Sequence, residues 1–104
     1  MLFHVTMTHS ADNCPAYHTE KYPEVFASLE NLEELGKKLN IKVHSLLWAA
    51  PDHVAYAVLE SDSLVMLGRF LNSIAIHQDF KITPVEHVKD VIEFGKAVMA
   101  QAKK

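Results

Sequence analysis

The sequence predicts an α+β fold, and three observations carry this prediction. Four segments show the period-two alternation or β-rich composition of strands, and two segments with helical spacing separate them in the order strand–helix–strand–strand–helix–strand. A third helical segment follows the last strand. The length of 104 residues, with 49% hydrophobic and 22% charged residues, indicates one globular domain spanning residues 1–104.

The first half of the chain contains one strand and one helix. Apolar and polar residues alternate over residues 2–8, which predicts a strand. Residues 9–22 form a polar connection, and connections of this length are often functional. Pro23 suits the first turn of a helix, and Asn40 is expected to end it. Between them, apolar residues or glycine recur at helical spacing: Val25, Leu29, Leu32, Gly36 and Leu39.

The second half begins with a predicted hairpin. Residues 42–50 and 53–60 are rich in strand-forming residues, and Ala50, Pro51 and Asp52 form a turn between them. Ser61, Asp62 and Ser63 are candidate caps for the second helix. The apolar stripe of that helix consists of Leu64, Leu67, Phe70, Leu71 and Ile74.

The chain ends with a fourth strand and a closing helix. Residues 78–85 alternate as a strand, and Pro84 within it favours an edge position because proline cannot donate a ladder hydrogen bond. Residues 87–100 are predicted to form an extra C-terminal helix. One side of this helix carries Val88, Val91, Ile92, Gly95, Val98 and Met99.

This order of elements is the ferredoxin-like βαββαβ pattern. Right-handed crossovers give a four-stranded antiparallel sheet in the order 4-1-3-2, with both helices on one face. The segments 64–70 and 79–85 resemble small uncharacterised members of the dimeric α/β-barrel superfamily. The resemblance implies a homodimer whose two sheets pack face to face. It implies no single activity, because the superfamily includes monooxygenases, haem-handling enzymes, isomerases and stress proteins.

The predicted layers independently favour a homodimer. Helices cover one sheet face, and we expect the other face to need a partner because soluble proteins rarely expose large apolar patches. The residues expected on that second face are Leu46, Trp48, Ala55, Ala57 and Leu59.

The seven histidines provide the main functional signal. In the 4-1-3-2 order, His9 follows strand one, His53 opens strand three and His77 precedes strand four, so all three lie at one end of the sheet. Cys14 and His18 can reach that end from the connection after strand one. Imidazole suits Zn, Cu, Fe and Ni, a thiolate favours Cu or Zn, and three protein ligands leave a coordination position open. We therefore predict a transition-metal or small-ligand site at this end of the sheet. The alternative is separate surface histidines at loop ends.

Other functions remain open from the sequence. Trp48, Tyr56, Phe70 and Phe80 either line a substrate pocket of a cofactor-independent monooxygenase or isomerase, or form an ordinary aromatic core. Cys14 and His18 are either a nucleophile pair or an inert cysteine beside a surface histidine.

Two further alternatives are a haem-binding protein and a protein without catalytic activity. Haem is a less favoured cofactor, with His77 or His87 as its ligand. A non-catalytic binding or stress protein is also consistent with the composition.

Composition limits the partners and the compartment. The net charge is −3, and the densest basic patch contains no interleaved aromatic residues, which argues against nucleic acid. Neither GxGxxG nor a P-loop occurs, which argues against nucleotides bound by those motifs. The single cysteine allows no intrachain disulfide, and no signal-peptide pattern or membrane-length apolar run is present. We expect a cytoplasmic protein with no membrane contact.

Overall fold

The computed structural model describes residues 1–102 and has the predicted order of elements. The strands are β1 (Leu2–Thr8), β2 (Lys42–Ala49), β3 (Val54–Glu60) and β4 (Asp79–Val85). The helices are α1 (Tyr22–Glu30), α2 (Leu32–Leu39), α3 (Leu64–Asn72) and α4 (Val88–Ala102). Single 3-10 turns occur at Ala11–Asn13, Pro15–Tyr17 and Thr19–Lys21 in the connection after β1, and at Ala50–Asp52 in the hairpin turn.

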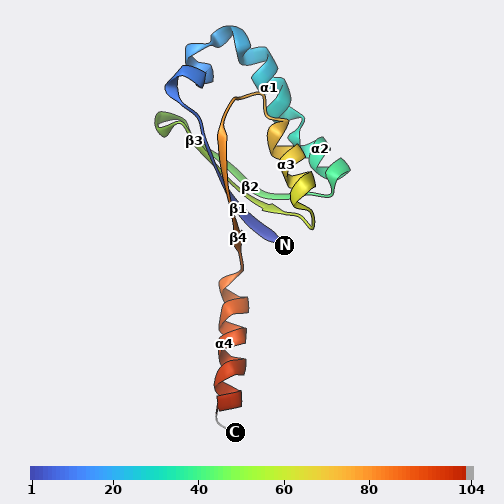
Figure 1. Cartoon of the computed structure of the whole chain (residues 1–104). Coiled ribbons are helices and arrows are strands. Elements are labelled where there is room, and N and C mark those ends of the chain that lie inside the picture. The colour runs from blue at the N-terminus through green and yellow to red at the C-terminus, as the bar shows by residue number, and fades with distance from the viewer. Residues whose placement is uncertain (103–104) are drawn as a thin grey trace.

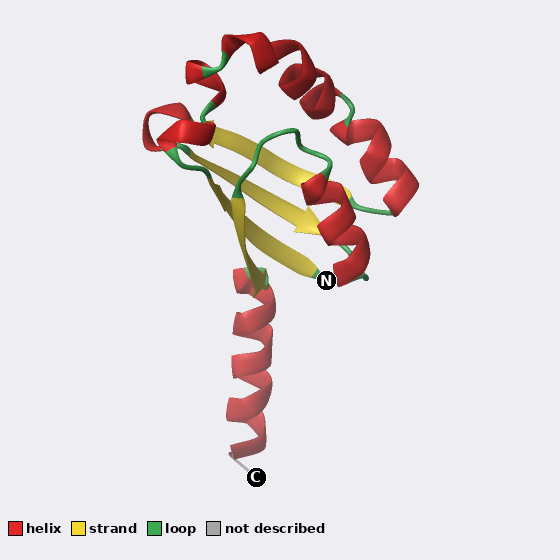
Figure 2. Ribbon diagram, turned by 45° about the horizontal axis from the view of Figure 1, so that its top comes forward, coloured by secondary structure: helices red, strands yellow, loops and turns green. Residues whose placement is uncertain are grey.

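The four strands form one antiparallel sheet in the order β2-β3-β1-β4, which confirms the predicted topology. β4 is an edge strand, as Pro84 indicated. Figure 2 shows α1, α2 and α3 over one face of the sheet. The fold is therefore α+β and ferredoxin-like, with α4 as an additional C-terminal helix.

The core lies between the sheet and these three helices. Alternate residues of β1 are buried because a strand points successive side chains to opposite faces. The same holds for β3. The helices contribute the other half of the core. The most deeply buried members are Val5, Met7, Ala57, Leu59, Leu67, Phe70 and Leu71.

The predicted composition of the uncovered sheet face is wrong. Leu46 pairs with Ala57 and Trp48 with Ala55, and both alanines are buried in the core, so all four lie on the face that the helices cover. Leu59 belongs to that core as well. β3 has apolar residues on both faces, so its alternation did not indicate which face points inward.

The uncovered face, here called the open face, consists of the alternate set of side chains. This face mixes polar and apolar side chains. Its members are Leu2, His4, Thr6, Thr8, Lys42, Ser45, Leu47, Ala49, Val54, Tyr56, Val58, Glu60, Asp79, Lys81, Thr83 and Val85.

The helix ends follow local chemistry. The single helix predicted before Asn40 is divided at Asn31 into α1 and α2. Asn40 adopts a left-handed conformation (φ 57°), and the next amide, of Ile41, donates to the Gly36 carbonyl over 2.8 Å, which closes α2 as predicted. The Ser63 hydroxyl accepts a 3.2 Å hydrogen bond from the Met66 amide and caps α3.

α4 forms where a helix was predicted, but it does not pack on the domain. It continues away from the end of β4 (Figure 1), and none of its residues, 88–102, is buried. The radius of gyration is 17.5 Å, whereas a compact chain of this length has about 13 Å. No helix within residues 1–102 combines the length and apolar character needed to cross a membrane.

Candidate metal centre

Three of the predicted ligands come together at one end of the sheet. His9 follows β1, Cys14 lies between two 3-10 turns of the next connection, and His53 ends the turn between β2 and β3. One ligand atom of each residue lies within 4.8 Å of the others. The strand order that places β1 beside β3 is what brings His9 and His53 together.

The backbone holds the two histidines side by side. The His9 amide donates a 3.2 Å hydrogen bond to the His53 carbonyl, which extends the β1–β3 ladder by one step. His53 has a left-handed backbone (φ 55°), and its amide donates to the Ala50 carbonyl over 3.2 Å. Histidine adopts this conformation more readily than most residues other than glycine. The hairpin turn therefore directs His53 back toward His9.

The imidazole rings lack the hydrogen bonds that buried rings normally make. The ring centroids of His9 and His53 are 5.2 Å apart with an interplanar angle of 79°. His9 Nε2 and His53 Nδ1 are buried, and neither has a hydrogen-bond partner among residues 1–102. An unpaired buried polar atom costs about 1–3 kcal/mol. The cluster therefore offers two imidazoles and a thiol as electron-pair donors.

Burial also affects the protonation of the site. His9 is only 9% exposed, and this burial, with repulsion from His53, holds the pKa of the His9 imidazole below its ordinary value of 6.5. The neutral imidazole is the form that binds a metal ion. His9 is therefore prepared for coordination at neutral pH.

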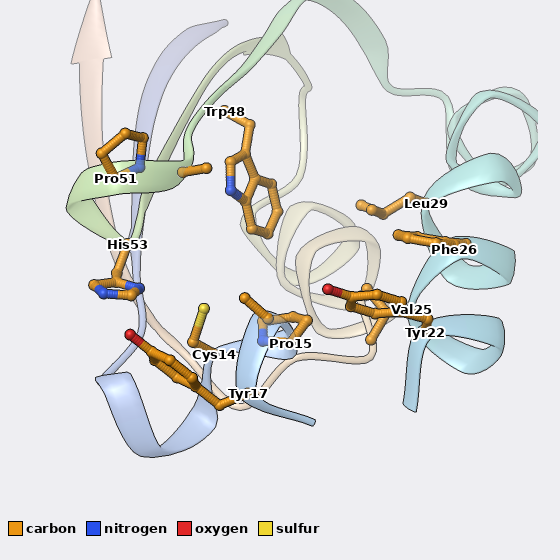
Figure 3. A pocket seen from close by; sticks show the side chains of 12 residues that line it. Cys14, Pro15, Tyr17, Tyr22, Val25, Phe26, Leu29, Trp48, Pro51 and His53 are labelled. Carbon is orange, nitrogen blue, oxygen red and sulfur yellow. The ribbon is translucent and has the colours of Figure 1, made fainter. Parts of the chain in front are cut away.

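A pocket of about 440 Å³ opens beside this cluster. Figure 3 shows Cys14 and His53 at one end of the pocket, and Phe26 and Leu29 at the other. Trp48, whose ring centroid lies 5.8 Å from that of His9, lines the pocket as well. The remaining lining residues are mostly apolar or aromatic: Pro15, Ala16, Tyr17, Tyr22, Val25, Ala50 and Pro51.

The other histidines lie outside the cluster. The His18 ring hydrogen-bonds through Nε2 to the Asp12 carbonyl, so it has a partner in its own loop. His77 is exposed in the connection before β4 and is not part of the cluster. His44 Nε2 lies 3.0 Å from a carboxylate oxygen of Glu60.

The aromatic pocket predicted from the sequence is only partly formed. Trp48 lines the pocket, whereas Phe70 is a core residue and Phe80 packs against the core. Tyr56 is on the open face, where its ring lies 6.0 Å from that of His4. Sequence reasoning missed Tyr17, Tyr22 and Phe26 as lining residues. The length of the connection after β1 was the available signal, since it supplies Tyr17.

Comparison with known proteins adds little about activity. No protein-family model matches the chain, and no curated protein matches it. Among solved structures, the chain is similar to a dimeric ferredoxin-like protein from an uncultured marine organism, with 17% identity and a TM-score of 0.34. The match covers 83% of this chain and 95% of that one. The ferredoxin-like assignment made above rests on this chain's own strand order and helix placement.

Proposed function

We propose that this protein is a small homodimeric protein that binds a transition-metal ion through His9, Cys14 and His53. One observation carries the proposal: one ligand atom each of His9, Cys14 and His53 lies within 4.8 Å of the others, and each of the two rings has a buried nitrogen without a hydrogen-bond partner among the described residues. An ion bound through those two nitrogens would satisfy both at once. It would also bring the ligand atoms closer together, since metal–nitrogen and metal–sulfur bonds are about 2.0–2.3 Å long.

The donor set favours zinc or copper over iron and nickel. A thiolate with two imidazoles suits both ions, and the Cys14 proton would leave as the thiolate binds. Three protein ligands leave one coordination position free. Because Cys14 and His53 also line the neighbouring pocket, a small molecule held there would have access to that position. The proposal therefore includes a small-molecule ligand as a second component of the site.

A second candidate function uses the pocket without a metal. The volume of about 440 Å³ and the mainly apolar lining, with the Tyr17 and Tyr22 side chains, are what a small aromatic substrate of a cofactor-independent monooxygenase or isomerase would require. A non-catalytic binding or stress protein would use the same pocket with no reaction. Binding of an aromatic probe to metal-free protein would favour these alternatives, and dependence of that binding on the metal would favour the proposed centre.

The metal proposal is tested by direct measurement of the ion. Protein purified without a His tag is expected to contain about one zinc or copper ion per chain by elemental analysis. Cobalt(II) added to metal-free protein should give visible absorption that depends on the Cys14 thiolate. Haem in place of these ions would appear as strong absorption near 400 nm.

Variants distinguish the cluster from the histidines outside it. We expect Cys14→Ser and His9→Gln each to weaken metal binding about 100-fold or more, because even residues behind the ligands contribute about 10–100-fold. His18→Gln and His77→Gln are matched controls and should leave the affinity within about twofold. Equal losses in the controls, or no loss in Cys14→Ser, would contradict the proposed ligand set.

A further inference from the structure

We propose that α4 is an exchanged arm: in a two-fold dimer, α4 of each chain packs on the open face of the other chain's sheet. This inference deepens the homodimer part of the proposed function and does not depend on the metal. The surface that docks is the apolar stripe of α4, defined as Val88, Val91, Ile92, Gly95, Val98 and Met99, with Phe94 at its border.

α4 exposes this stripe completely within its own chain. The large apolar side chains of the stripe are between 47% (Val98) and 73% (Val88) exposed, and Phe94 is 71% exposed. An isolated helix of about 12–15 residues is marginal in water, and α4 has 15 residues. Helices of this length are stabilised in proteins by packing an apolar face, so α4 requires a surface to cover that stripe.

The same chain offers a surface of matching character and size. Leu47 is 65% exposed on the open face, and Tyr56, Val54 and Val58 flank it on β3. At about 1.5 Å per residue α4 is about 22 Å long, and a seven-residue strand spans about 23 Å. One helix laid along the strands would therefore cover the open face from end to end.

The geometry at the β4–α4 junction favours a second copy of this chain. Only two residues separate β4 from α4, and α4 continues away from the sheet rather than turning back over it (Figures 1 and 2). A two-fold axis near residues 86 and 87 would place each α4 beside the other chain's sheet. Such an interface is self-complementary, since the same contact is made twice, and it closes at two chains.

Gly95 lies at the centre of the stripe and is consistent with close packing there. Glycine costs about 1 kcal/mol relative to alanine inside a helix. A Cβ added at Gly95 would meet no atom within 4 Å in its own chain, so nothing in the protomer requires a glycine. Close approach of a partner backbone would explain why this position is glycine.

Dimer dissociation tests the two surfaces separately. We expect Leu47→Glu on the open face and Ile92→Glu on the arm each to raise the dimer dissociation constant at least tenfold, measured by light scattering over a dilution series. Val65→Glu is the matched control, because Val65 is a 71% exposed apolar residue on α3, outside both surfaces. Its dimer should dissociate as the unaltered protein does. Circular dichroism checks that each variant is folded.

Crosslinking identifies the surface on which α4 packs and the chain to which that surface belongs. Chains that carry a photoreactive benzophenone amino acid at position 92 are prepared in ¹⁴N- and ¹⁵N-labelled form and mixed. After irradiation, crosslinked peptides are identified by mass spectrometry. Mixed-isotope links from α4 to peptides of β1, β2 or β3 support the exchange. Links within one chain show an arm folded on its own sheet, links between two α4 peptides show paired arms, and either result overturns the proposal.

The outcomes also separate the arm from the broader function. A dimer that links elsewhere refutes the exchanged arm and leaves a homodimeric metal protein. A monomer at all concentrations refutes the arm and the homodimer together. Metal content is measured independently of both results.

Discussion

His9 and His53 differ from the other histidines in what surrounds their ring nitrogens. The rings of His18 and His44 have polar partners nearby, whereas His9 Nε2 and His53 Nδ1 are buried without any among the described residues. Neither burial nor hydrogen bonding can be read from residue type. The sequence therefore named five candidate ligands, of which the folded chain gathers His9, Cys14 and His53.

The lowered pKa of His9 predicts a pH dependence of stability. Because the pKa of His9 in the folded protein is below 6.5, the unfolded chain takes up a proton first as the pH falls. In metal-free protein, the free energy of unfolding should therefore have its full value above pH 6.5 and should decrease as the pH falls below 6.5. Urea titrations at a series of pH values measure this change.

Two variants assign this dependence. His9→Gln should flatten the decrease in stability, because the buried titrating group is gone. His77→Gln should leave the slope unchanged, since His77 is exposed. The same slope in His9→Gln as in the unaltered protein would show that another group is responsible.

At the scale of elements, local sequence signals predicted most of the architecture. The alternation in β1, the turn at Ala50–Asp52 and the Ser63 cap all correspond to observed features. The break at Asn31 was not predicted, because the apolar spacing of residues 25–39 continues across it. Which face of β2 and β3 points inward was predicted wrongly, since both faces of β3 carry apolar residues.

The three glycines inside helices provide a prediction at this scale. In Gly36→Ala, the new Cβ would lie 3.0 Å from the Ile41 carbonyl oxygen, a backbone atom that cannot move independently. We expect a destabilisation of about 1–3 kcal/mol, because overpacking outweighs the gain in helix propensity. Thermal or urea unfolding measures the change.

Gly68→Ala is the matched control for this substitution. A Cβ at Gly68 would meet nothing within 4 Å, so the variant should be more stable by about 0.5–1 kcal/mol through helix propensity alone. A stabilised Gly36→Ala would show that the turn between α2 and β2 adjusts freely.

At the scale of the whole molecule, the candidate metal centre and α4 lie at opposite ends of the sheet. His9 follows β1 at one end, whereas Val85, directly before the junction with α4, pairs with Leu2 at the other. The pocket beside the metal centre is lined by Trp48 from the face that the helices cover, whereas the proposed docking surface is the open face, so binding and self-association use different faces of the sheet.

This separation predicts independent sites. Ile92→Glu, which is expected to dissociate the dimer, should still bind one metal ion per chain with an affinity within about twofold of the unaltered protein. Elemental analysis and cobalt(II) titration of the dissociated variant measure this. Loss of the ion on dissociation would place part of the site in the partner chain.

The sequence by itself determined the order of strands and helices, the turn and cap positions and the end of the sheet where His9 and His53 meet, because these follow from local periodicity and from the few ways to connect βαββαβ. Only the tertiary structure decided which side chains share a face, which histidine nitrogens are left without partners and where α4 goes. Burial and contact depend on residues far apart in the chain, and a helical pattern shows that a face is apolar without showing what covers it.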